Sequence, residues 1–269
     1  MTMRTTKMRI CLLLAVMVFS TSGYAADTVE KYDVHDKSRK NPRVMTPPER
    51  VGQPAADAIV LFDGQDTSEW VSDKNPKGEF PWKLKDDYME VVKKAGGIHT
   101  KKSFGSCQLH IEWRTPTDID PRITDQKRSN SGIHFMGKYE VQILDSYTKD
   151  NYNDNKTYAD GQAAAIYGQH PPMVNVCRPA GEWQTYDISF LKPLFDEEGK
   201  VSRKARITVL HNGVVVHNNL EIEGTTAHKK KATYKPHGIE PIRLQDHGNP
   251  IRFRNIWIRE LSEQPYRIK

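Results

Sequence analysis

The sequence predicts an all-β protein, folded as a sandwich or barrel of short strands. From Ala58 onward, short apolar or alternating runs follow one another, and turn signals such as Gly96-Gly97 and Gly248-Asn249-Pro250 separate them. No amphipathic helix of three or more turns stands out, and no repeat of fixed period is visible. Many short strands with long polar loops favour this fold class. We expect strands at residues 59–62, 88–92, 109–113, 132–136, 139–144, 183–190, 205–210, 214–216, 242–245 and 251–259.

Two local features refine the strand prediction. Asn212-Gly213 separates two β-branched runs, which is a strong signal for a two-residue hairpin turn. The alternation of apolar and polar residues in 251–259 slips by one position near Asn255. One extra residue in a strand produces such a slip, so we expect a β-bulge there.

The N-terminus has the pattern of an export signal. Arg4, Lys7 and Arg9 precede an apolar run at 10–19 that is too short to span a bilayer, and small residues follow up to Ala25. We therefore expect a signal peptide at 1–25, export to the periplasm or the medium, and no membrane span. Residues 26–56 are rich in charge and proline and predict an extended leader. The remainder, 57–265, is expected to form one β-sandwich domain.

Charge and composition exclude some functions. Lys and Arg number 40 against 34 Asp and Glu, but the signal peptide holds three of the cations, so the mature chain has 37 against 34. This balance lacks the concentrated basic stripe of nucleic-acid-binding proteins, so no nucleic-acid partner is expected. Cys107 and Cys177 lie in separate segments without metal-type spacing. Two buried thiols are the favoured interpretation, and a disulfide between them stays open.

The strongest candidate site lies in the run 139–145. Strand parity places Glu140 and Gln142 on one face, and a bulge near Leu144 could return Asp145 to that face. Two carboxylates this close on one sheet suit acid–base chemistry. The polar outer face of an ordinary sandwich is the alternative interpretation.

Three other predicted strands or strand ends also carry hydrogen-bonding side chains between apolar ones. Sugar rings combine apolar faces with hydroxyl edges, so polar groups beside aromatics such as Trp113, Tyr139 and Trp257 favour a carbohydrate-binding cleft. The residues that we assign to this cleft besides Glu140 and Gln142 are Glu112, Arg114, Asn130, His134, Asp145, Gln245, His247 and Arg254.

A series of short motifs runs through the chain in a fixed order. They are Leu61-Phe62-Asp63-Gly64, Gly96-Gly97-Ile98-His99-Thr100, Glu112-Trp113-Arg114, Asn130-Ser131-Gly132-Ile133-His134, Tyr139-Glu140-Val141-Gln142-Ile143-Leu144-Asp145, Gly181-Glu182-Trp183, Leu244-Gln245-Asp246-His247-Gly248 and Phe253-Arg254-Asn255. This series closely resembles the 3-keto-disaccharide hydrolase domain family, over roughly residues 58–262. The resemblance implies a concanavalin A-like jelly-roll β-sandwich with a concave binding face. It also implies cleavage of 3-keto-glycosides by hydrolysis or by elimination across C1–C2. The insert at 116–128 and the loop at 146–162 depart from the family pattern and leave substrate specificity open.

The implied substrate suggests roles for the candidate residues. A ketone at C3 acidifies the hydrogen on C2, so a base there can start β-elimination of the group on C1. We expect Glu140 or His134 as the base and His247 as the acid for the leaving oxygen. Gln142, Asn130 and Arg254 would orient the sugar or stabilise the enolate. A divalent metal at O2 and O3 also stays open, with Glu112, His134, Glu140 and His247 as candidate ligands.

Two other classes of function remain open at the sequence level. Glu140-x-Gln142-x-x-Asp145 resembles the catalytic strand of laminarinase-type enzymes with its middle Asp replaced, so a conventional retaining glycosidase is one. Retention needs two carboxyls about 5–5.5 Å apart. The other is a lectin-like module that binds carbohydrate without cleaving it, through aromatic and amide side chains.

Overall fold

The computed structural model describes residues 31–32, 34–35, 37–38, 41–120, 122–148, 156–262 and 267–268. The predicted signal peptide lies outside these residues. Residues 42–263 form one compact unit. A second unit comprises the two chain ends, in which β1 (Lys31–Tyr32) pairs in parallel with β17 (Arg267–Ile268). In the described part of the chain, no helix is long and apolar enough to cross a membrane.

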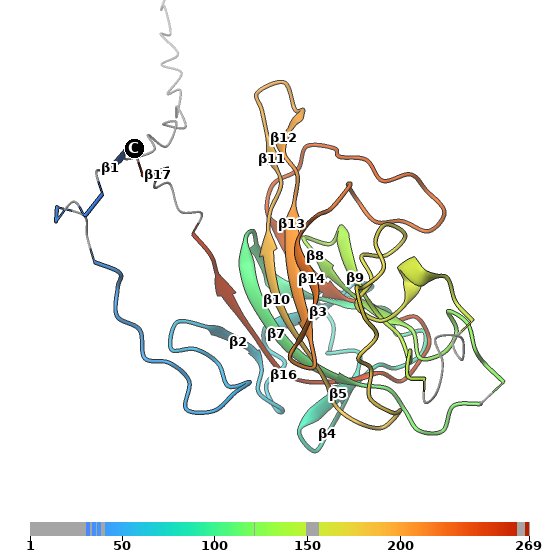
Figure 1. Cartoon of the computed structure of the whole chain (residues 1–269). Helices are drawn as coiled ribbons and strands as arrows, with labels where there is room; N and C mark the ends of the chain where they lie inside the picture. The colour runs from blue at the N-terminus through green and yellow to red at the C-terminus, as the bar shows by residue number, and fades with distance from the viewer. Residues whose placement is uncertain are drawn as a thin grey trace, which may run out of the picture. The chain divides into compact units, whose positions relative to one another are not determined.

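The larger sheet of the compact unit has eight strands, and every pairing in it is antiparallel (Figure 1). Its order is β14-β13-β10-β7-β16-β5-β4, and β2 also pairs with β16. The strands are β2 (Ile59–Phe62), β4 (Lys83–Lys85), β5 (Tyr88–Glu90), β7 (Cys107–Arg114), β10 (Gln184–Leu191), β13 (Arg206–His211), β14 (Val214–Glu221) and β16 (Arg252–Glu260).

The smaller sheet has five antiparallel strands in the order β3-β6-β15-β8-β9. They are β3 (Trp70–Ser72), β6 (Ile98–Phe104), β15 (Glu240–Leu244), β8 (Ser131–Phe135) and β9 (Tyr139–Ile143). A separate ribbon pairs β11 (Leu194–Phe195) with β12 (Val201–Arg203), and a single 3₁₀ turn, η1, spans Ala159–Gly161.

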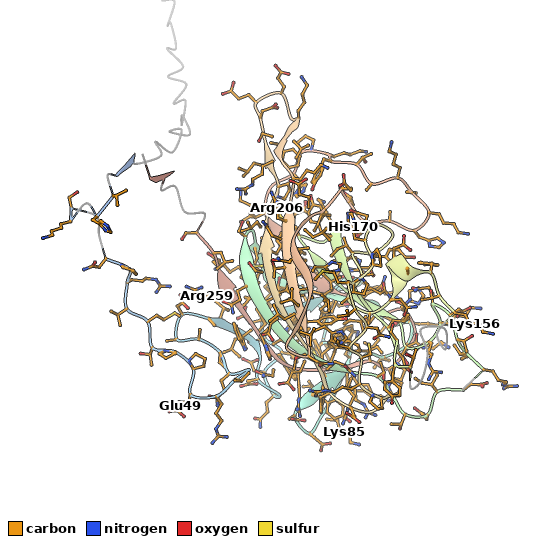
Figure 2. All side chains as sticks on the ribbon, viewed as in Figure 1. Glu49, Lys85, Lys156, His170, Arg206 and Arg259 are labelled. Carbon is orange, nitrogen blue, oxygen red and sulfur yellow. The ribbon has the colours of Figure 1, made fainter. Side chains whose placement is uncertain are left out.

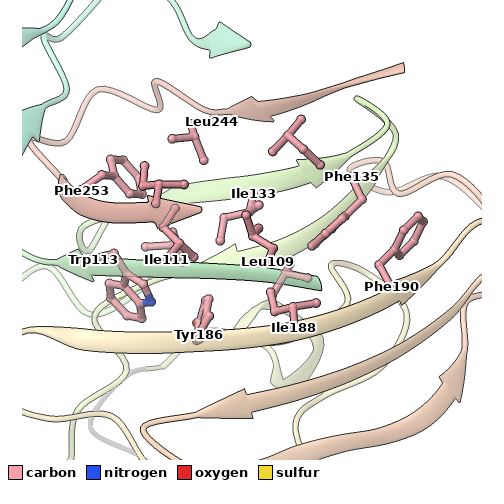
Figure 3. Close-up of a cluster of buried hydrophobic side chains, with 14 of the residues drawn as sticks. Leu109, Ile111, Trp113, Ile133, Phe135, Tyr186, Ile188, Phe190, Leu244 and Phe253 are labelled. Atoms are coloured by element: carbon pink, nitrogen blue, oxygen red, sulfur yellow. The ribbon is translucent and has the colours of Figure 1, made fainter. Parts of the chain in front are cut away.

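The hydrophobic core lies between the two sheets. Alternate residues of β10 and β13 are buried there, and Phe135 of β8 stacks on Phe190 of β10 with ring centroids 4.8 Å apart. Figure 3 shows this layer, in which the labelled side chains of one sheet, Leu109, Ile111, Trp113, Tyr186, Ile188, Phe190 and Phe253, gather against Ile133, Phe135 and Leu244 of the other. The prediction of an all-β jelly-roll sandwich is therefore confirmed.

Both local predictions are confirmed as well. Asn212 and Gly213 have φ of 51° and 81° and close the β13–β14 hairpin, as a type I′ turn requires. The pairing of β16 with β7 shifts register between Arg254 and Trp257, and Asn255 there has φ of 45°. The strands predicted from the sequence do not include β3, β4, β6, β11 and β12, because these strands are short or carry exposed polar residues.

The end of the predicted leader contacts the larger sheet. The carbonyl oxygen of Gly52 accepts hydrogen bonds from Trp257 Nε1 and Asn255 Nδ2, each 2.9 Å long. Asp57 pairs with Arg259, which is labelled in Figure 2, at 2.7 Å. The thiols of Cys107 and Cys177 are both free, so the two cysteines are not bridged.

Candidate active site

The outward face of the smaller sheet carries the candidate site. On β8 and β9, Ile133 and Val141 are buried in the core, so parity turns Gly132, His134 and Glu140 to the opposite face. His134 and Glu140 are register partners, with His134 Nε2 3.5 Å from Glu140 Oε2. His134 and Glu140 therefore lie next to each other, as the sequence predicted.

A row of polar side chains continues across this face. Arg243 of β15 is the register partner of both His134 and His99. Asp73, which follows β3, accepts a hydrogen bond from Arg243 Nε at 2.5 Å and lies 2.8 Å from His99 Nδ1. We call Asp73, His99, Arg243, His134 and Glu140 the polar row.

The electrostatics of the polar row suit proton transfer near neutral pH. Glu140 is 7% exposed, and burial raises the pKa of its carboxyl to about 7, against the opposing effect of Arg243. Burial, with a smaller contribution from Arg243, lowers the pKa of His134 to about 4. At neutral pH the imidazole is therefore uncharged, while the neighbouring carboxyl exchanges its proton. A carboxyl of this kind is a competent general base.

Gly132 makes room for the Glu140 carboxyl. A Cβ atom at position 132 would lie 2.3 Å from Glu140 Oε1, which is far inside van der Waals contact. The backbone at Gly132 also accepts a hydrogen bond from the Gln245 amide at 3.0 Å. The absence of a side chain at this position thus defines where the carboxylate can lie.

An open pocket of about 230 Å³ borders the polar row. His99 and Arg243 line it together with Gly137 and Pro241. The Arg243 side chain is 33% exposed, so its guanidinium can still reach a ligand while Asp73 fixes its orientation. The pocket offers the volume and the cation that a small polar ligand needs.

Gln142, Asn130 and Asp145 form the buried frame next to the row. Gln142 Nε2 donates to Asn130 Oδ1 at 3.2 Å, and Asn130 Nδ2 donates to the Gln126 carbonyl at 2.7 Å. Asp145 is 3% exposed and pairs with Arg128 at 2.8 Å. The side chains of Gln142, Asn130 and Asp145, which the sequence predicted to bind a ligand, are therefore bonded to other residues of the protein.

Gln245 and His247 follow β15, which ends at Leu244. The backbone of Gln245 pairs with Gly132, so parity brings its side chain to the same face as Glu140. His247 is exposed in the loop after β15, and it makes no hydrogen bond or ion pair with another described residue. Its expected role as the acid stays a prediction.

The structure places Glu112, Arg114 and Arg254 elsewhere, which corrects the prediction of one shared cleft. Ile111 and Trp113 of β7 point into the core, so Glu112 and Arg114 face outward from the larger sheet. The two sheets pack against each other through their apolar faces, so each sheet has a separate outward face. Parity predicts the face of a strand but not the sheet to which the strand belongs.

Those three residues belong to a second polar cluster. Arg254 Nε donates to Glu112 Oε2 at 2.7 Å, and its guanidinium lies 4.1 Å from the Trp183 ring centroid. Arg114 lies 4.5 Å from the same centroid. Glu112 therefore cannot share a metal ion with His134 or Glu140. Among the described residues, no three His, Cys, Asp or Glu side chains form a group that could hold a metal ion.

Sequence reasoning missed three members of the polar row: Asp73, His99 and Arg243. The position of Arg243 between the core residues Ile242 and Leu244 carried a usable signal, because parity turns it outward beside Gln245. His99 stood in a recognised motif without an assigned role. Asp73 carried no signal of its own, since only the sheet order brings it beside Arg243.

Comparison with known proteins identifies the family. A model described as the 3-keto-alpha-glucoside-1,2-lyase-like domain matches residues 57–259. The chain belongs to this family. Membership confirms the family resemblance and makes the chain a carbohydrate-active enzyme.

Similar proteins and solved structures agree with this family assignment. A 3-keto-disaccharide hydrolase of Bacteroides thetaiotaomicron is 22% identical over 250 residues, which cover 76% of this chain and 78% of that protein. The solved structure of a candidate glycosyl hydrolase from Parabacteroides distasonis is 44% identical, with a TM-score of 0.77, and the match covers 84% of this chain and 95% of that one. A second structure from the same organism, 18% identical with a TM-score of 0.55 and covering 77% and 94% of the two chains, shares the fold.

Proposed function

We propose that this protein cleaves 3-keto-glycosides by elimination across C1–C2, with water addition giving net hydrolysis. The observation that carries the proposal is the Glu140 carboxyl, whose pKa is raised to about 7 and which stands in one row with the Arg243 guanidinium. Family membership and the Bacteroides relative support the same substrate class.

The order of the polar row matches the order of the reacting atoms. Arg243 and Glu140 lie on strands two positions apart in the sheet, about 10 Å between backbones at the usual strand spacing. Their side chains can therefore contact neighbouring atoms of one sugar ring. The ketone oxygen on C3 would face Arg243 and His99, and the hydrogen on C2 would face Glu140.

The reaction then needs no change of oxidation state in the protein. Glu140 removes the proton from C2, and the electron pair moves into an enolate whose oxygen Arg243 stabilises. Collapse of the enolate forms the C1–C2 double bond and breaks the bond from C1 to the glycosidic oxygen, which takes a proton. Addition of water to that double bond gives the free 3-keto sugar. The neutral His134 beside Glu140 aligns the carboxyl.

The structure disfavours a conventional retaining glycosidase. Such an enzyme needs a second free carboxyl beside Glu140, and the candidate from the sequence was Asp145. Asp145 is buried in an ion pair with Arg128, and the intervening Gln142 amide is bonded to Asn130.

Turnover in D₂O tests the proposal directly. With a 3-keto-glucoside, elimination followed by water addition should introduce one deuterium at C2 of the product sugar, detected by mass and NMR. The unoxidised parent glucoside should not react. Product incubated without enzyme controls for spontaneous exchange at C2. Cleavage without deuterium at C2, or equal cleavage of the parent glucoside, would contradict the mechanism, and binding without cleavage would indicate a lectin.

Export of the protein also stays a proposal, supported by the N-terminal sequence pattern. Expression of the full chain in a Gram-negative host should yield a mature protein that begins at Ala26. N-terminal sequencing of the periplasmic fraction checks this, and an intact Met1 in the cytoplasm would contradict it.

A further inference from the structure

A second pocket borders the polar row beyond Glu140. Its volume is about 270 Å³. The backbone amide of Tyr167 donates to the Glu140 carbonyl at 3.2 Å, so this segment runs beside β9 on the side away from β8. The lining residues are Tyr158, Asp160, Tyr167, Gly168, Ala227, His228, Lys229 and Lys230.

Hydrogen bonds of two tyrosine hydroxyls connect the side chains that line this pocket. The Tyr158 and Tyr167 hydroxyls lie 2.7 Å apart, and the Tyr167 hydroxyl lies 2.9 Å from His228 Nδ1. The loop that carries His228 is fixed to the sheet, because the Glu140 amide donates to Thr226 Oγ1 at 3.1 Å. The aromatic rings and hydroxyls therefore have a set position relative to Glu140.

The charge of the lining is positive. Lys229 and Lys230 are exposed, and neither forms an ion pair with any described residue. Asp160 is the acidic residue of the lining. Tyrosine rings suit the apolar face of a sugar, and lysine ammonium groups suit a carboxylate. An acidic sugar combines both features.

The geometry of the proposed reaction points the leaving group to this pocket. In the sugar ring C3, C2 and C1 follow one another. If the oxygen on C3 faces Arg243 and C2 faces Glu140, C1 and its leaving group extend further along the row, toward Tyr167. We propose that the pocket beyond Glu140 binds the leaving group of the substrate, and that it selects leaving sugars that carry a carboxylate. This inference rests on the proposed function.

Paired substrates test the selection. The 3-keto-glucosides of glucuronate and of glucose differ in one carboxylate on the leaving sugar. Wild-type kcat/KM should favour the glucuronate substrate, and Lys229→Gln with Lys230→Gln should reduce this preference by about tenfold, with less effect at high salt. The kcat/KM for the glucose substrate should fall less than that for the glucuronate substrate, because glucose carries no carboxylate for the two ammonium groups to attract.

A matched variant controls for general charge effects. Lys83 and Lys85 are equally exposed lysines on β4 of the other sheet, and Lys85 is labelled at the edge of the molecule in Figure 2. Lys83→Gln with Lys85→Gln should leave the preference intact. An equal loss of preference in both double variants, or no preference in the wild type, would overturn the inference.

A binding measurement separates failure of this inference from failure of the proposed function. Glucuronate alone, titrated into the wild type and followed by NMR, should shift resonances of Tyr158 and Tyr167, and Lys229→Gln with Lys230→Gln should weaken its binding about tenfold. This result would support the pocket even if no 3-keto-glycoside is cleaved. Cleavage without glucuronate binding would overturn the pocket and leave the proposed function intact.

Discussion

Burial of Glu140 costs stability above neutral pH and suits the proposed role of its carboxyl as a base. Burial raises the pKa of its carboxyl to about 7, above the value of 4.5 for a free side chain. The native state therefore holds this proton more tightly than the unfolded state does. The resulting contribution to stability is fully present below pH 4.5 and is lost as the pH rises through 7.

Glu140→Gln should therefore stabilise the protein and inactivate it. The neutral amide keeps the shape of the side chain without the buried charge, so the free energy of unfolding at pH 8 should rise by about 2–3 kcal/mol. The turnover number should fall by about 10²–10⁴. Chemical denaturation at pH 4 and pH 8, beside a turnover assay, checks both. Equal stability of variant and wild type at pH 8 would contradict the raised pKa.

His110 on the larger sheet carries a positive charge at neutral pH, unlike His134. Burial alone would lower the pKa of its imidazole, but the hydrogen bond with Asp187 and the nearby Glu112 carboxylate, 3.8 Å away, raise it to about 9. Its Nδ1 lies 2.7 Å from Asp187, and its ring stacks on Trp257. The buried imidazolium thus joins two strands of the sheet.

The stability that His110 provides should be lost in alkaline solution. Because the native pKa exceeds the unfolded value of 6.5, this contribution is complete below pH 6.5 and disappears as the pH rises through 9. The wild type should lose about 2–3 kcal/mol between pH 6.5 and pH 10 that His110→Gln does not lose. Denaturation curves across this range test the difference, and parallel curves would refute the charge assignment.

At the scale of elements, the hairpin of β8 and β9 places His134 beside Glu140, the proposed base. Register aligns His134 with Glu140, and parity turns both out of the core. Gly132, two residues before His134, leaves the space that the Glu140 carboxyl occupies. Backbone geometry and the absence of a side chain at Gly132 together orient the Glu140 carboxyl.

Gly132→Ala should impair catalysis more than folding. The new methyl group would displace the Glu140 carboxylate, and a misplacement of about 1 Å can cost about 10² in turnover. Gly238→Ala is the matched control, because a Cβ there meets nothing within 4 Å. Steady-state kinetics and melting curves of both variants test this. A Gly132→Ala enzyme with wild-type turnover would show that Glu140 needs no such space.

At the scale of the whole molecule, the leader contacts the sandwich at Gly52 and through the exposed pair of Arg43 with Asp57. The described residues 41–56 contribute nothing to the core cluster, yet the Gly52 carbonyl accepts hydrogen bonds from Trp257 and Asn255. Removing it would leave the Trp257 indole N–H without its acceptor, whereas Asn255 Nδ2 also donates to Glu112 Oε1 at 2.9 Å. The cost of truncation should thus depend on where the cut falls.

Two truncations of the mature chain test this dependence. Deletion of 27–49 keeps Gly52 and should leave Tm unchanged within about 1 °C. Deletion of 27–53 should lower the free energy of unfolding by about 1–3 kcal/mol and Tm by several degrees. Calorimetry of the two proteins gives the comparison, and identical melting of both would show that the Gly52 contact adds no stability.

The sequence alone determined the fold class, most strands and the central pair of the site. The period of two in 139–143 already turned Glu140 away from Val141, and Asn212-Gly213 fixed a hairpin, because strand parity and turn geometry are local properties of the chain. The slip near Asn255 likewise predicted the bulge in β16.

Only the tertiary structure decided which outward faces coincide. Glu112 and Glu140 both alternate with core residues, yet they lie on different sheets, since parity carries no information about strand order. Strand order also brought Asp73, His99 and Arg243 into one row with His134. Burial, which raises the pKa of Glu140, is likewise set by neighbours distant in the chain. The electrostatics of the site therefore depend on long-range packing, while local backbone geometry positions His134 and Glu140.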